Sequence, residues 1–301
     1  GTEGIGESCY WAFPRATQEI IRSFESDLVG MDPANTEHIW NYLYRKQSFR
    51  GNGLSGAISA IDIALWDIKG KRLQAPVWDL LGGRARDRVR AISLDVTGET
   101  PEELAASART ILHNGFTALK FIPMRGEWWL DRYPNFIRAC LAQVEAVREA
   151  VGWNFDIAIE IHRNMLPSEA VVFIQECAKY LPYFVEDPIA PDSVLAMADV
   201  ARKINVPLAV GERNTGIWEF REYAELSRCH FLKPDVGMAG GISQLRKIEH
   251  AARVTIIMEA SRKRIDAKNR TSKSATPRMA SPTTLPSPMG TRNAMANSIR
   301  P

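Results

Sequence analysis

The sequence predicts an α/β protein in which a parallel (β/α) barrel follows a mostly helical region. First, acidic residues close three short apolar runs: Glu160 in DIAIEIH, Glu186 in YFVEDP and Glu212 in PLAVGER. Both intervals between them are 26 residues, the length of one strand, one helix and two loops. Second, apolar runs alternate with helical patterns from about residue 86 to 258. Equal spacing predicts that each carboxylate occupies the same place on successive βα units.

The first 85 residues form a region of helical pattern. ATQEIIRSFESDLVG is amphipathic, and SGAISAIDIALWDIKGK carries a broad apolar face that precedes the stop signal Gly82-Gly83. We expect residues 1–85 to be a cap or lid. Their abrupt, glycine-rich opening GTEGIGES indicates a domain that is incomplete at its N-terminus.

The barrel is expected over residues 86–258. One intervening helix has Thr100 as its N-cap, Glu103 as the capping-box partner and Gly115 as its stop. No GxGxxG or GxxxxGK[ST] occurs, which argues against a nucleotide cofactor. Seven strands nearly close a barrel, and we expect its C-terminal part to be incomplete. The predicted strands are residues 89–96, 116–123, 156–162, 183–188, 207–213, 230–236 and 253–258.

The last segment, residues 259–301, differs in composition from the rest of the chain. It contains no Phe, Tyr or Trp and is rich in Ser, Thr, Pro and Arg, so we expect a disordered basic tail. Without aromatic residues to stack on bases, such a tail does not indicate a nucleic-acid partner. The whole chain of 301 residues has a net charge of +3 and no apolar run long enough to span a membrane.

Cysteine usage favours a cytoplasmic protein. The four cysteines form no CxxC pair, which is typical of reduced thiols and not of disulfides or zinc ligands. They are Cys9, Cys140, Cys177 and Cys229.

The three strand-end acids predict a site for a hard divalent cation, Mg²⁺ first. A single acidic residue in such a place is often only a helix N-cap or a solvated loop charge. Three at constant spacing are harder to explain in that way, because carboxylates buried together repel one another without a cation between them.

Several motifs together resemble the enolase superfamily, within it the galactonate- or gluconate-type sugar-acid dehydratases of the mandelate racemase and muconate-lactonising branch. They are IEIHRNM, VEDPIAPDSVLAMADVARKINVPLAVGER and FLKPDVGMAGGISQLRKIEHAA, preceded by SGAISAIDIALWDIKGK and PVWDLLGG. The resemblance covers residues 1 to about 255. It implies an α+β capping domain on a modified TIM barrel, with Mg²⁺ bound by Glu160, Glu186 and Glu212. The family more often has Asp at the first position, and Glu160 is one methylene longer.

The resemblance also implies a reaction, the conversion of an aldonate to a 2-keto-3-deoxy acid. His162 would protonate the leaving hydroxyl; capping of the next helix is the alternative role. Lys120 would be a catalytic or carboxylate-binding lysine, although Ile122 stands where a K-x-K pattern has its second lysine. Arg213 is a substrate-binding candidate, with pairing to neighbouring acids as its alternative. Asp235 would orient a general base.

That general base, in the family a His after the seventh strand, has no counterpart here. No His follows His250, and the composition changes abruptly near Val254, as a change of reading frame would cause. Three hypotheses therefore stay open: a Mg²⁺-dependent sugar-acid dehydratase, either active or inactive in this form, a racemase or cycloisomerase of the same superfamily, and a non-catalytic remnant or metal-binding protein. The expected partner is a small-molecule sugar acid, with no nucleic acid or membrane, in a cytoplasmic homo-oligomer.

Overall fold

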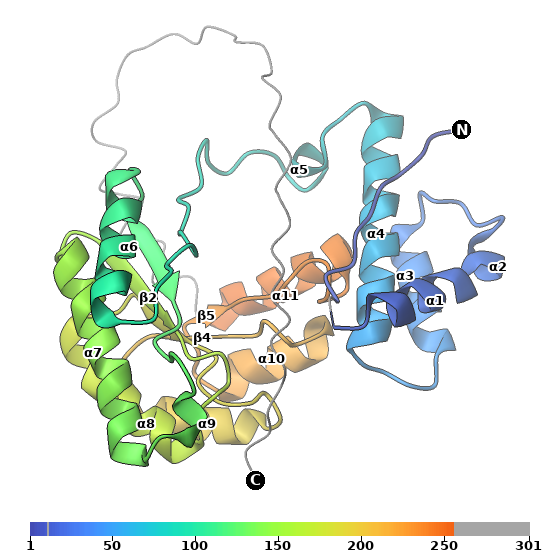
Figure 1. The fold of residues 1–301 in the computed structure, drawn as a ribbon. Coiled ribbons are helices and arrows are strands. Elements are labelled where there is room, and N and C mark those ends of the chain that lie inside the picture. The colour runs from blue at the N-terminus through green and yellow to red at the C-terminus, as the bar shows by residue number, and fades with distance from the viewer. Residues whose placement is uncertain (11, 256–301) are drawn as a thin grey trace, which may run out of the picture.

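The computed structural model describes residues 1–10 and 12–255, which form two parts. We call them the cap (residues 1–82) and the barrel part (residues 83–255), and Figure 1 shows them side by side. Regular structure in the described residues of the cap is helical. Its helices are α1 (Pro14–Ser23), α2 (Glu25–Leu28), α3 (Thr36–Lys46), α4 (Asn52–Leu73) and α5 (Val77–Leu80).

Helix α4 is the centre of the cap. One side of it packs on α1 and α3 through a core that includes Phe24, Trp40, Leu43 and Ile58, all almost fully buried. The helix ends at Leu73, earlier than the Gly82-Gly83 stop that the sequence predicted. Gln74 takes the left-handed conformation that closes many helices, and a proline follows at position 76.

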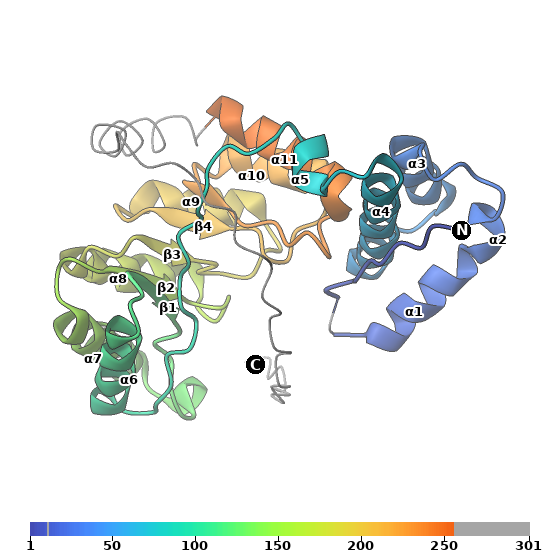
Figure 2. The ribbon, with the colours of Figure 1, turned by 90° about the horizontal axis from the view of Figure 1, so that it is seen from above.

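The barrel part is a five-stranded parallel sheet whose strands follow one another in chain order. Helices cover its outer face, as Figure 2 shows for α6, α7 and α8. The strands are β1 (Ala118–Phe121), β2 (Asp156–Glu160), β3 (Phe184–Glu186), β4 (Leu208–Val210) and β5 (Phe231–Leu232). The α-helices are α6 (Pro101–His113), α7 (Tyr133–Val151), α8 (Pro167–Cys177), α9 (Val194–Lys203), α10 (Gly216–Leu226) and α11 (Gly241–Thr255), and η1 (Trp128–Leu130) and η2 (Ala178–Tyr180) are 3₁₀-helices.

Strand alternation sorts the side chains of the sheet into two groups. Ile157 and Ile159 belong to the large core between sheet and helices, whereas Ala158 packs with Phe184 and Ala209 in a separate small cluster. Residues two apart in a strand point to the same face of the sheet. Side chains two positions after the members of this small cluster therefore share its face and lie at the carboxyl ends of the strands. Among the described residues, no helix combines the length and the apolar character that crossing a membrane requires.

The predicted capping box is confirmed at the start of α6. The Thr100 hydroxyl accepts the Glu103 N–H at 3.3 Å, and the Glu103 carboxylate accepts the Thr100 N–H at 3.3 Å. Gly115 follows the helix with a positive φ of 86°.

The predicted first barrel strand, residues 89–96, is wrong as a regular strand. Only one bridge forms, between Ser93 and Leu119 of β1, with hydrogen bonds from Ser93 N to Ala118 O at 3.0 Å and from Lys120 N to Ser93 O at 2.8 Å. Within the described part of the chain, β1 is the neighbour on one side and no strand pairs on the other. These two hydrogen bonds make a single bridge and not a continued ladder, so the segment is not a regular strand.

The predicted seventh strand, residues 253–258, is also corrected. Residues 253–255 continue α11, and the remaining three lie outside the described residues, as does the tail at 259–301. The sequence after Gly241 reads ISQLRKIEHAARVT, without Gly or Pro, so nothing ends the helix where β-branched residues begin.

The cap and the barrel part meet where α4 reaches the start of α11, which lie side by side in Figures 1 and 2. Ser59 Oγ accepts the Gly240 N–H at 2.9 Å, and Asp62 accepts both the N–H of Ser243 at 2.9 Å and its hydroxyl at 2.6 Å. Trp66 Nε1 donates to Ser243 Oγ at 3.0 Å. Asp62 therefore caps α11 from another helix, where the helix dipole favours a negative charge.

Asp62→Asn should flatten part of the pH dependence of stability. Burial raises the pKa of Asp62 from 3.8 to about 6, so this carboxyl contributes stability that is complete below about pH 4 and is lost as the pH rises through about 6. Between pH 4 and pH 7, the free energy of unfolding of the wild type should fall by up to ~3 kcal/mol relative to that of Asp62→Asn. Denaturant unfolding across this pH range measures the difference. Asp67→Asn, on the same helix but more exposed, is the control. Parallel pH profiles of wild type and Asp62→Asn would contradict the prediction.

Candidate metal and active site

Four acidic residues meet at the carboxyl edge of the strands. Glu160, Glu186, Asp187 and Glu212 each offer one oxygen, and these oxygens lie within 4.8 Å of one another. Glu160 and Glu186 are opposite each other in the ladder between β2 and β3, and Glu186 is only 1% exposed. The structure thus brings together the three acids that the sequence singled out and adds Asp187.

Glu212 reaches the cluster by a different route from the other two. Strand β4 ends at Val210, and the ladder places Ala209 opposite Glu186, so Glu212 lies three residues beyond the equivalent place. Gly211 makes this possible, with a φ of 122° and no room for a Cβ, which would lie 2.6 Å from the Phe220 ring. Equal spacing in sequence therefore does not mean equal position on the strands.

Two lysines neutralise the centre of the cluster. Lys120 Nζ lies 2.8 Å from Glu160 Oε2 and 2.7 Å from Glu186 Oε2, and Lys233 Nζ bonds the same oxygen of Glu186. Burial opposes charge on Glu186, but Lys233 and Lys120 outweigh it and hold its pKa below the ordinary value. Burial also opposes charge on Lys120, and the two glutamates outweigh it and raise the lysine pKa.

Two arginines bind the outer acids. Arg163 Nη1 lies 3.0 Å from Glu212 Oε2 and 3.4 Å from Asp187 Oδ2, whereas Arg213 Nη2 lies 3.4 Å from Glu212 Oε1. Arg213 thus pairs with a neighbouring acid, the alternative role that the sequence analysis considered for it. Arg163 (φ 66°) and Asp187 (φ 41°) both adopt left-handed backbone conformations, which L-residues avoid unless the surroundings compensate.

His162 and Asp235 are placed differently. His162 lines the cavity beside the acids and donates its backbone N–H to Glu160 Oε1 at 2.8 Å. Burial, then Arg163, lowers its side-chain pKa. Asp235 does not line that cavity; its Oδ1 accepts the Gly237 N–H at 2.8 Å, and its carboxylate is hydrogen-bonded to Cys9.

The cavity above the acids measures about 410 Å³, a size common for small-molecule sites. Both charged and apolar side chains line it. Its lining consists of Leu94, Val96, Lys120, Phe121, Ile122, Arg125, Glu160, His162, Glu186, Glu212 and Lys233.

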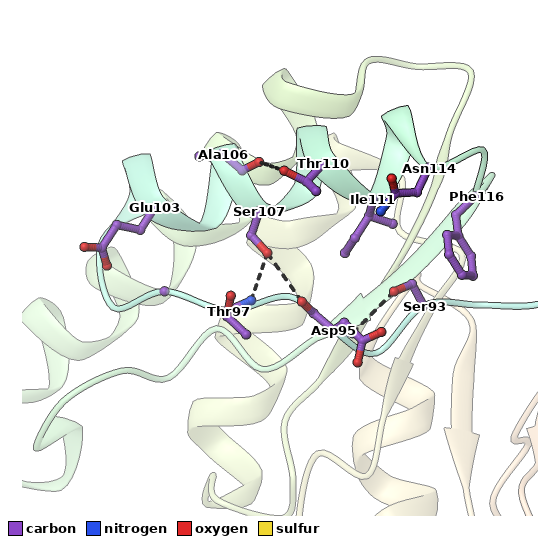
Figure 3. A pocket seen from close by; sticks show the side chains of 11 residues that line it. Ser93, Asp95, Thr97, Glu103, Ala106, Ser107, Thr110, Ile111, Asn114 and Phe116 are labelled. Atoms are coloured by element: carbon purple, nitrogen blue, oxygen red, sulfur yellow. Dashed lines mark hydrogen bonds between the residues drawn. The ribbon is translucent and has the colours of Figure 1, made fainter. Parts of the chain in front are cut away.

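A larger cavity of about 700 Å³ lies elsewhere, between α6 and residues 93–98 (Figure 3). Two of its hydroxyls already have partners within the chain: Ser107 Oγ with Thr97 N at 3.0 Å and Asp95 O at 3.4 Å, and Thr110 Oγ1 with Ala106 O at 3.1 Å. Size alone would favour this cavity, but the convergent acids and lysines make the smaller one the candidate site.

Sequence reasoning missed three residues of the cluster: Arg163, Asp187 and Lys233. Each belongs to a motif quoted above: Arg163 to IEIHRNM, Asp187 to VEDP and Lys233 to FLKPD. Asp187 could have been found as the second acid of the VEDP motif. Lys233 could have been found by parity, since it is two residues from Phe231, which lies beside the inner cluster.

The donor set fits a hard divalent cation. All four donors are carboxylate oxygens, the ligands that Mg²⁺ and similar ions take, and they are mostly buried. Burial and the neighbouring charge of Glu186 raise the pKa of Glu160, and burial raises that of Asp187 to about 6. Acids whose ionisation is penalised in this way gain most from a cation between them.

Comparison with known protein families shows which family this chain belongs to. A family model described as Enolase C-terminal domain-like matches residues 103–258, and the Mandelate racemase / muconate lactonizing enzyme N-terminal domain matches residues 1–82. The chain belongs to the enolase superfamily. The two matches also support the mandelate racemase and muconate-lactonising branch that the motifs indicated, and a fold of N-terminal cap plus TIM barrel.

Individual members of the enolase superfamily agree. D-galactonate dehydratase of Variovorax paradoxus (strain S110) is 34% identical over 249 residues, which are 82% of this chain and 65% of that relative's length. A solved enolase superfamily member from Salmonella Typhimurium has a TM-score of 0.80 at 32% identity, covering 84% of this chain and 71% of the other. An enolase from Agrobacterium radiobacter, with bound Na and L-malate and an ordered active site, has a TM-score of 0.79 at 30% identity, covering 84% and 65%.

Glu186→Gln should abolish saturable Mg²⁺ binding. The substitution keeps the shape of the side chain and removes the central charge of the cluster, so we expect affinity to fall more than ~100-fold, since even outer partners of a metal contribute 10–100-fold. Isothermal titration with Mg²⁺ measures the effect, with Glu176→Gln on the exposed side of α8 as the matched control. Equal binding by wild type and Glu186→Gln would exclude this cluster as the metal site.

Proposed function

We propose that this chain binds Mg²⁺ and a sugar acid, and that its reaction is the dehydration of an aldonate to a 2-keto-3-deoxy acid. One observation carries the proposal: the four converging carboxylate oxygens beside a 410 Å³ cavity that also contains His162 and Lys120. Kinship to D-galactonate dehydratase supports the choice of reaction.

The ligands of the proposed cation are Glu160, Glu186 and Glu212. When bound, a divalent cation would stabilise the negative charge that develops on the substrate carboxylate as the α-proton leaves. Asp187 lies within the same group of oxygens, but its Oδ1 accepts the Gly211 N–H at 3.3 Å. We assign Asp187 to holding the turn after β4 in place.

Lys120 is proposed to bind the substrate carboxylate. Its two carboxylate partners keep it protonated at neutral pH, which suits an anion-binding group and not a general base. This argues against the racemase alternative, in which Lys120 would have to take the proton. Arg213 faces Glu212 from outside the cavity lining, and we propose that it positions this acid for its contact with the cation.

His162 is proposed to protonate the departing hydroxyl. Asp235 is proposed to hold the place where the family orients a histidine that takes the α-proton. No His follows His250, so the chain offers no histidine at the position that the family uses as its base. We therefore expect slow turnover, which added imidazole should accelerate if the missing base limits the rate.

The proposal is tested by incubating the protein with Mg²⁺ and a panel of aldonates and aldarates, and measuring 2-keto-3-deoxy products with and without imidazole. We expect one or few acids to react, faster with imidazole and not at all in Glu186→Gln. If a folded sample that binds Mg²⁺ forms no product from any acid under either condition, the dehydratase proposal fails and a metal-binding protein remains.

His162→Asn should lower kcat by about 10²–10⁴-fold, the usual contribution of a general acid. Mg²⁺ affinity should stay near wild type, because the imidazole is not among the four oxygen donors. Because the His162 pKa is lowered, its protonated fraction falls as the pH rises above that pKa, and the wild-type rate should fall with it. His113→Asn, at the exposed end of α6, is the control. An unchanged kcat would remove His162 from the mechanism.

A further inference from the structure

We infer that Lys233 competes with the metal for Glu186. Metal binding should therefore depend on whether an organic acid anion is bound in the cavity. This inference rests on the proposed metal site. It begins from one oxygen, Glu186 Oε2, which accepts hydrogen bonds from both Lys120 and Lys233. A cation that binds this oxygen must replace at least one of the two ammonium groups.

The charges of the mouth are already balanced without a metal. Four carboxylates pair with four basic side chains, and ion pairs connect the members of this cluster; a fifth basic side chain, Arg125, lines the same cavity. A divalent cation would therefore add two positive charges to a mostly buried region, where charges interact more strongly than in water. An anionic ligand restores the balance, so metal and acid should each favour the binding of the other. The four paired basic side chains are Lys120, Lys233, Arg163 and Arg213.

Lys233 is the lysine that yields more readily. Lys120 binds two carboxylates and its side chain is 14% exposed, whereas Lys233 binds Glu186 alone and is 32% exposed. Its ammonium already lies 5.6 Å from the centre of the Phe184 ring, a face that can hold a cation. Its backbone is fixed by a hydrogen bond from Lys233 N to Val210 O at 2.9 Å, so only the side chain has to move.

Once released, the Lys233 ammonium is at the cavity wall beside Lys120. Two ammonium groups on one side of the cavity favour a ligand with a carboxylate, and the sugar acids of the proposed function have one. Lys233 would then be a positioning residue for the substrate anion, in addition to its competition with the metal.

The test compares Mg²⁺ binding by wild type, Lys233→Met and Lys233→Arg in isothermal titration without any organic acid. Met keeps the length of the side chain and removes its charge, so Lys233→Met should bind Mg²⁺ at least about tenfold more tightly than wild type. Lys233→Arg keeps the charge and should remain close to wild type. Lys247→Met, an exposed lysine paired with Glu37 on the cap, is the matched control and should also remain close to wild type.

Thermal unfolding gives a second reading. In EDTA, Lys233→Met should melt below wild type, because Glu186 loses a partner, and its Tm should rise further than that of wild type when Mg²⁺ is added. If Lys233→Met does not fold, Lys233→Gln takes its place in both measurements.

Equal or weaker Mg²⁺ binding by the neutral variants would overturn the inference. Tighter binding by Lys233→Met supports it even where no aldonate reacts, so that failure of the dehydratase reaction is seen separately. If neither wild type nor any Lys233 variant binds Mg²⁺, both the metal site and this inference are overturned.

Discussion

The mutual repulsion of buried carboxylates is the constraint on which the rest of the mouth depends. Glu160 and Glu186 are placed side by side by the ladder of β2 and β3, so strand pairing itself creates the repulsion. The fold compensates with long cationic side chains, Lys120 from β1 and Lys233 from just beyond β5, which reach the same carboxylate from the two ends of the strand order β1-β2-β3-β4-β5. These two ammonium groups offset the negative charge that strand pairing concentrates at Glu160 and Glu186.

Sequence reasoning found those parts of the site that depend on strand period. Glu160 and Glu186 end apolar runs, and parallel pairing brings such ends together. It could not find Arg163 and Lys233 as partners of the acids, because their long side chains can reach several neighbours and only the positions of the strands decide which. Glu212 joins the cluster for a different reason from the one that the sequence suggested: the turn at Gly211, and not equal spacing, brings it there.

The fold, like the site, could be predicted where it depends on local sequence pattern. A parallel βα repeat and the capping box at Thr100 follow from local pattern, and both are present. Residues 89–96 and 253–255 were misread for a related reason. β-branched and apolar residues indicate a strand only where a partner pairs with it, and the helix α11 continues where no breaker stops it. Tertiary context, which the sequence does not display locally, decided both segments.

The polar joint between α4 and α11 also bears on the order of folding. Ser59 and Asp62 of α4 both find their partners 181 residues further along the chain, and Trp40 of the neighbouring α3 finds its partner, Gly240 O, 200 residues further. During synthesis from the N-terminus, the cap helices therefore emerge long before the start of α11 exists to receive them. Contacts so distant in sequence are late and slow to form, so the polar row of α4 stays solvated until most of the barrel part has been made. The cap can complete its own apolar core early, yet it docks last.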